Sequence, residues 1–128
     1  MKISKFFSTL FLLICVSSVA QEDDPNWSAI EDETLKHFRA LLQFDTSDPP
    51  GRELPAAEYL KEVLDSEGIA VELLFNDPER PNVVARLKGN GSKEPLLIMA
   101  HTDVVNVDPE KWLFPPFSAT VDGGYVYG

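Results

Sequence analysis

The spacing of hydrophobic positions changes once along the chain, from a helical period to short strand-like runs. Between residues 27 and 44 apolar side chains recur every three to five positions, with charged side chains largely between them, which predicts an amphipathic helix. A second helix is predicted over residues 53 to 67, because Pro55 falls in its first turn and Gly68 follows it as a stop signal. The intervening segment DTSDPPG, residues 45 to 51, holds two prolines and a glycine, so we expect a turn or loop there.

Beyond Gly68 the chain contains three short apolar or β-branched runs, which are IAVELLF, PNVVARL and PLLIMA. Turn-forming segments separate them, so we expect three strands. PLLIMA is apolar at every position, which predicts a strand covered on both faces. The final segment SATVDGGYVYG alternates around Asp122, Gly123 and Gly124, as a hairpin does. Two helices followed by strands predict an α/β fold, with a mixed sheet and flanking helices.

The first twenty residues have the composition of a secretory signal peptide. Lys2 and Lys5 precede an apolar stretch, and the small residues Ser18 and Ala20 end it. A membrane anchor is the alternative, but the uncharged stretch is shorter than the roughly 20 apolar residues that span a bilayer. We therefore expect residues 1 to 20 to be removed and the protein to be secreted or periplasmic, with no membrane association after cleavage.

Composition limits the chemistry of the mature chain. The single cysteine, Cys15, lies inside the predicted signal peptide, so a mature metal site must use nitrogen and oxygen ligands. The formal net charge is −10 and becomes more negative when Lys2 and Lys5 are removed. Such acidity argues against nucleic acid or an anionic membrane as a partner.

The candidate chemistry lies in AHTD, residues 100 to 103, at the end of the predicted buried strand. Because successive strand residues face opposite ways, His101 and Asp103 are expected on one face and Thr102 on the other. Ligand sites in α/β sheets lie at the carboxyl ends of strands. His101 could bind zinc through one ring nitrogen while Asp103 holds the other N–H. By themselves, these three residues favour a structural histidine at a strand end, hydrogen-bonded to a nearby carboxylate.

The flanking sequence favours a metal ligand over a structural histidine. PLLIMAHTDVVNVDPEKWLFPPFSATVDGGYVYG resembles a block found in the metallopeptidases that include acetylornithine deacetylase, succinyl-diaminopimelate desuccinylase, aminoacylase and the glutamate carboxypeptidases. That block has an apolar strand, His-x-Asp-Val-Val, a tryptophan, Pro-Phe and an Asp-Gly-x-x-Tyr-Gly hairpin. LLQFDTSDPPG, AAEYLKEVLDSEGI and RPNVVARLKG are similar to the family's opening helices and first strands, in the same order. The resemblance covers residues 27 to 128.

The resemblance implies a zinc-dependent hydrolase of amide or peptide bonds: an exopeptidase, a carboxypeptidase or an N-acyl amino acid deacylase. It implies two Zn²⁺ ions in a complete catalytic domain, with His101 as a metal ligand and Asp103 as the catalytic residue that orients it. A small peptide or N-acyl amino acid is the expected substrate, and a homodimer is possible in the full-length form. A related aminopeptidase group also uses His-x-Asp, but the Val-Val, tryptophan and Pro-Phe run favours the first group.

The sequence departs from the family pattern where it stops, at Gly128. The family continues with an Asp-x-Lys motif, a Glu-Glu pair, a further acidic ligand and a distal histidine. We therefore expect residues 21 to 128 to be a truncated, incomplete amino-terminal part of a zinc-exopeptidase catalytic domain, inactive alone. The alternative is a non-catalytic α/β binding or structural module.

Other chemically suggestive residues have simpler interpretations. His37 is expected to be an exposed or half-buried surface residue. Asp45, Asp48 and Asp122 are better explained as turn or cap acids. Asn106 replaces a proline common in the family, with no loss of a ligand. Three residues are expected to pack the loop over the site: Trp112, Pro116 and Phe117.

Overall fold

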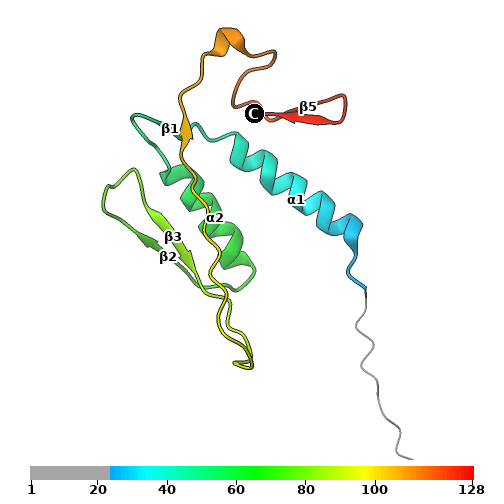
Figure 1. Cartoon of the computed structure of the whole chain (residues 1–128), viewed down its shortest axis with the longest axis vertical. Coiled ribbons are helices and arrows are strands. Elements are labelled where there is room, and N and C mark those ends of the chain that lie inside the picture. Colours follow the sequence, from blue (N-terminus) through cyan, green and yellow to red (C-terminus); the bar gives the residue numbers. More distant parts are fainter. Residues whose placement is uncertain (1–23) are drawn as a thin grey trace, which may run out of the picture.

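Two helices and three pairs of short strands make up residues 24 to 128, the part of the chain that the computed structural model describes (Figure 1). The predicted signal peptide and Cys15 lie outside the described residues. The helices are α1 (Trp27–Leu42) and α2 (Leu54–Ser66), with a short 3₁₀ turn η1 (Pro109–Lys111). The strands are β1 (Ser47–Asp48), β2 (Val71–Leu74), β3 (Asn82–Ala85), β4 (Val104–Val105), β5 (Thr120–Asp122) and β6 (Tyr125–Tyr127).

The predicted fold class, mixed α/β, is confirmed. β1 and β4 pair in parallel, whereas β2 pairs with β3 and β5 with β6 in antiparallel register. The strands do not join into one sheet but form three separate two-stranded sheets. Helices and strand pairs are therefore both present, and the strand pairing is more divided than the sequence predicted.

Both helices form within a few residues of their predicted bounds. The Asn26 side chain accepts a hydrogen bond of 3.3 Å from the Ala29 N–H, which caps the start of α1. Pro55 lies in the first turn of α2, as predicted. At the end of α2 the N–H of Gly68 donates to the Asp65 carbonyl at 3.0 Å, which closes the last turn. Local sequence signals were sufficient to place these elements.

The helix α2 packs against the hairpin β2–β3 (Figure 1). Its buried residues are Ala56 and Ala57, whose small side chains allow close approach. The helix α1 contributes no buried residue, and Trp27 and Phe38 remain 64% and 49% exposed. In the described part of the chain, the buried apolar core is centred on α2 and is small.

The predicted terminal hairpin is confirmed. Thr120 pairs with Tyr127 and Asp122 with Tyr125, around a turn at Gly123 and Gly124. Arg39 of α1 donates from Nε to the carbonyl of the buried Ala119 at 3.1 Å. This contact fixes the hairpin beside α1.

The prediction of a covered, hydrogen-bonded strand over PLLIMA is wrong for this structure. Residues 94 to 103 form no strand ladder, and the side chains of Leu96 to Met99 are 77 to 85% exposed. A strand needs a neighbour to satisfy its backbone groups, and no other part of residues 24 to 128 pairs with this segment. Apolar sequence without a partner leaves the segment unpaired and exposed.

None of the helices within residues 24 to 128 is long and apolar enough to cross a membrane.

Candidate metal centre

His101 and Asp103 lie against each other, as the sequence predicted. The ring Nδ1 of His101 is 2.8 Å from the Asp103 backbone carbonyl oxygen and 3.2 Å from its carboxylate Oδ1. Both neighbours are acceptors, so Nδ1 is the nitrogen that carries the hydrogen in the neutral ring. The lone pair then lies on Nε2. Because the His101 side chain is 84% exposed, Nε2 is open to a ligand.

This arrangement has the form of a metal-binding histidine held by an acceptor behind it. Histidine ligands commonly donate their second N–H to a carboxylate or a carbonyl, which fixes the tautomer and the ring orientation. His101 bonds to the Asp103 backbone carbonyl, and the carboxylate of the same residue lies 3.2 Å from Nδ1. The pair therefore suits the ligand and orienting roles that the resemblance implied.

The described residues do not complete a metal site. Within residues 24 to 128, no three side chains of His, Cys, Asp or Glu come close enough to hold an ion. A catalytic zinc centre ordinarily has three protein ligands. The donor set fits one ligand of such a centre, His101, with its carboxylate partner, and no more.

The backbone around Asp103 is held by the turn that follows α1. Thr46 is 3% exposed, and its hydroxyl donates to the Thr102 carbonyl at 2.7 Å. The Thr46 carbonyl accepts the Val104 N–H at 3.2 Å. The parallel pairing of β1 with β4 continues from there, with Ser47 opposite Val104. The turn thus supports the chain on the carboxyl side of His101.

A partly buried ion pair between Glu53 and Arg80 supports the turn itself. The Glu53 carboxylate, 4% exposed as a residue, accepts from Nε and NH2 of Arg80 at 2.9 Å each. Arg80 also lies 3.2 Å from the Asp48 carboxylate in β1. The bond to Glu53, followed by the charges of Asp48 and Glu53, raises the pKa of Arg80 above its usual range. Arg80 therefore links β1 to the start of α2.

Gly51 permits this packing. Its φ is +76°, and a Cβ atom at this position would lie 2.6 Å from Nε of Arg80. A side chain here would both strain the backbone and displace the guanidinium. From the sequence, Gly51 was expected only to form a turn, and no role was predicted for Thr46, Glu53 or Arg80. Glu53 and Arg80 are 27 positions apart, so no local period joins them.

The predicted turn acids differ in their contacts. The Asp45 carboxylate accepts the Ser47 N–H at 3.1 Å. Hydrogen bonds from Ser47, its side chain first and its backbone N–H second, hold the pKa of Asp45 below its usual value. Asp45 is thus a turn acid, as predicted. Asp48 instead pairs with Arg80, and Asp122 directly precedes the hairpin turn.

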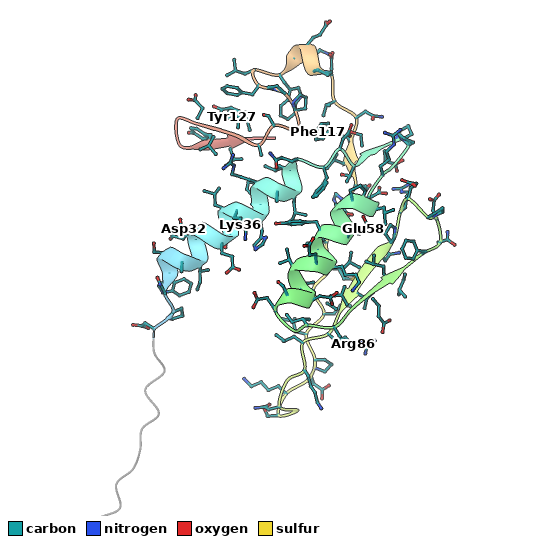
Figure 2. The ribbon with its side chains drawn as sticks, turned by 180° about the vertical axis from the view of Figure 1, so that it is seen from behind. Asp32, Lys36, Glu58, Arg86, Phe117 and Tyr127 are labelled. Atoms are coloured by element: carbon teal, nitrogen blue, oxygen red, sulfur yellow. The ribbon has the colours of Figure 1, made fainter. Side chains whose placement is uncertain are left out.

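The three residues predicted to pack the loop line part of a hollow next to His101. A largely apolar cavity of about 680 Å³ is bordered by α1, the segment 100 to 107 and the following loop, and its lining includes His101, Trp112, Pro116 and Phe117. Figure 2 shows Phe117 near the carboxyl end of α1 and the β1–β4 pair. Asn106 instead borders a second cavity of about 420 Å³, with Asp45 and Arg52. Trp112 and Phe117 therefore line the same hollow as His101.

His37 is half-buried and already has partners, so its predicted place at the surface is confirmed. Its Nδ1 is 2.6 Å from the Tyr59 hydroxyl, and Nε2 is 3.7 Å from the Glu33 carboxylate. The contact with Tyr59 links α1 to α2. A packing role explains this histidine.

No family model matches the chain. Curated relatives do match it. One is the N-formyl-4-amino-5-aminomethyl-2-methylpyrimidine deformylase of Halalkalibacterium halodurans, 33% identical over 123 residues, which cover 93% of this chain and 28% of that protein. Probable succinyl-diaminopimelate desuccinylases of Staphylococcus aureus and Staphylococcus epidermidis are 33% and 37% identical over 100 residues, covering 77% of this chain and 24% of each relative.

The chain spans about a quarter of the length of the curated relatives that it matches. The similarity extends over most of its own length and agrees with the motifs around His101. The chain therefore belongs to the amidohydrolase and peptidase family in which these deformylase and desuccinylase relatives are found.

Proposed function

We propose that this chain is the amino-terminal part of the catalytic domain of an exported, zinc-dependent hydrolase of amide or peptide bonds. The observation that carries the proposal is the orientation of His101. Its Nδ1 is hydrogen-bonded to the Asp103 carbonyl with the Asp103 carboxylate nearby, and Nε2 is left open, in a chain related to amide hydrolases.

In this proposal each residue of the pair has a separate task. His101 holds one zinc ion through Nε2, and Asp103 keeps the ring in the required tautomer by accepting the Nδ1 hydrogen. When bound by a complete ligand set, zinc activates a water molecule and polarises the amide carbonyl. Trp112 and Phe117, which line the hollow beside His101, limit the access of bulk water to that side.

The substrate is proposed to be a small N-acyl amino acid or peptide. The names of the relatives describe a deformylase and desuccinylases, so the proposed reaction is removal of an acyl group from an amine. The acidic composition of the chain supports a small-molecule partner over nucleic acid. Export through residues 1 to 20 and dimerisation of the full-length form complete the proposal.

The chain alone is proposed to be inactive. Residues 24 to 128 supply one metal ligand and its partner, and the relatives are about three times as long as this chain. The remaining ligands would come from further residues of a longer protein. Two zinc ions per complete catalytic domain are expected.

An activity assay on the full-length protein tests this proposal. The full-length protein, purified with zinc, is expected to hydrolyse formyl, acetyl or succinyl amino acids or dipeptides. The chain 21–128 alone is expected to hydrolyse none of them. His101→Ala is expected to lower kcat/KM about 10³-fold or more, which corresponds to about 4 kcal/mol of transition-state stabilisation. His37→Gln, at the only other histidine of the chain, is the matched control and should stay within a few-fold of the wild type.

The opposite outcome would favour a non-catalytic module. A zinc-loaded, folded full-length protein without activity on any of these amides would contradict the proposal. Equal activity of the His101→Ala and wild-type proteins would contradict the role given to His101.

A further inference from the structure

We infer that Thr46 is a positioning residue for the His101–Asp103 pair. Thr46 is 3% exposed and makes two hydrogen bonds to the chain around Asp103, one through its side chain and one through its backbone. The inference rests on the proposed function, because the positioned groups are the proposed ligand and its orienting carboxylate.

The backbone contact fixes the direction of the carbonyl that holds His101. The N–H of Val104 donates to the Thr46 carbonyl at 3.2 Å. In a trans peptide the N–H and the preceding C=O point in opposite directions across one plane. The Asp103 carbonyl must therefore point away from Thr46, and it lies 2.8 Å from Nδ1 of His101.

The side-chain contact fixes the neighbouring peptide plane. The Thr46 hydroxyl donates to the Thr102 carbonyl at 2.7 Å, and this carbonyl shares a plane with the Asp103 N–H. The two peptide planes that flank Asp103 are thus both held by one residue. Their orientation sets the position of the Asp103 Cα and the direction from which its carboxylate reaches Nδ1 at 3.2 Å.

Nothing on the other side of His101 can take over this task within the described residues. The segment from Leu96 to Met99 is exposed and forms no strand ladder. The pair is therefore oriented by contacts to the residues that follow His101 in the chain. Loss of the Thr46 hydroxyl would remove the hydrogen bond that holds the Thr102 carbonyl and leave the ring of His101 less well oriented.

The test compares Thr46→Val, which keeps the side-chain shape without the hydroxyl, with Thr46→Ser, which keeps the hydroxyl. Ser66→Ala is a matched control, because the Ser66 hydroxyl also donates to a carbonyl, that of Val63, at 2.7 Å, but in α2. The variants are made in the full-length protein. Zinc affinity is measured by competition with a chromophoric chelator, kcat and KM with an N-acyl amino acid, and the unfolding temperature after zinc removal.

Thr46→Val is expected to weaken zinc binding about 10- to 100-fold, the usual effect of removing support behind a ligand, and to lower kcat with little change in KM. Thr46→Ser and Ser66→Ala should stay within about threefold of the wild type, on the same scale. The inference is overturned if Thr46→Val retains wild-type zinc affinity and kcat, even with a lower unfolding temperature. It is equally overturned if Thr46→Ser is as defective as Thr46→Val.

Failure of the proposed function gives a different result. In that case the wild-type protein itself binds no zinc and hydrolyses no amide. Amide hydrogen exchange at Asp103 and Val104 then tests whether the Thr46 hydroxyl positions this segment. Faster exchange in Thr46→Val than in Thr46→Ser supports the positioning of this segment by the hydroxyl, and equal exchange overturns it.

Discussion

The two stretches on either side of His101 differ in the hydrogen bonding of their backbones. Leu96 to Met99 precede it, are 77 to 85% exposed and form no strand ladder. Thr102 to Val105 follow it, accept the Thr46 hydroxyl bond and pair with β1. The difference lies in the neighbours available to each stretch. Composition makes a strand possible, and a hydrogen-bonding partner makes it form.

The comparison also explains how the candidate centre is held. The supported stretch is fixed by the turn 45 to 51, which is in turn fixed by Glu53 and Arg80. The unsupported stretch brings the chain to His101 but does not orient it. Changes in the turn and its support should therefore have larger effects than changes in the exposed stretch.

The largest effect is expected from Gly51→Ala. The new Cβ would occupy a left-handed backbone position and meet the Arg80 guanidinium, with a cost of about 2–3 kcal/mol in the free energy of unfolding. Gly91→Ala is the matched control, since its φ of +77° is nearly the same and nothing lies within 4 Å. It should cost about 1 kcal/mol. Urea unfolding of both variants measures the difference, and equal values would show that contact with Arg80 contributes nothing.

A smaller loss is expected from Glu53→Gln. The substitution keeps the size of a buried side chain and removes the charge that Arg80 contacts, so unfolding should become about 1–2 kcal/mol easier. Glu62→Gln, on an exposed position of α2, should change stability by no more than about 0.5 kcal/mol. Denaturant titration of the two variants at one pH gives the comparison. A Glu53→Gln protein as stable as the wild type would show that the ion pair with Arg80 does not stabilise the fold.

A still smaller effect is expected in the exposed stretch. Leu97 is 77% exposed, so Leu97→Ser in the chain 21–128 should change the free energy of unfolding by no more than about 0.5 kcal/mol. Denaturant unfolding of this chain measures it. A loss of several kcal/mol would mean that the stretch is covered in solution, which would contradict its exposure in the structure.

The smallest expected effect is that of Asp45 on the pH dependence of stability. Because hydrogen bonds from Ser47 lower its pKa in the folded chain, folding favours the ionised carboxylate. This contribution is present above the ordinary pKa of about 3.9 and is lost as the pH falls from there through the lowered value. Ser47→Ala, which removes the largest cause, should lose less stability over that acid range than the wild type. Parallel acid-dependence curves for the two proteins would contradict the assignment.

The sequence predicted those features that depend on neighbouring residues. The helical period and Pro55 placed α2, the turn at Gly123 and Gly124 placed the hairpin, and the spacing of His101 and Asp103 predicted their contact. Features that depend on distant residues were missed. Thr46 acts on a carbonyl 56 positions away, and the environment of PLLIMA is set by the strands that do or do not lie beside it.

The most direct test of the central proposal, that His101 is a zinc ligand, is the zinc content of the full-length protein with His101→Ala, measured by atomic absorption after dialysis. About two ions per chain are expected for the wild type and for His37→Gln, and about one for His101→Ala, because one of two adjacent sites loses its histidine. An unchanged zinc content in the folded His101→Ala protein would contradict the proposal.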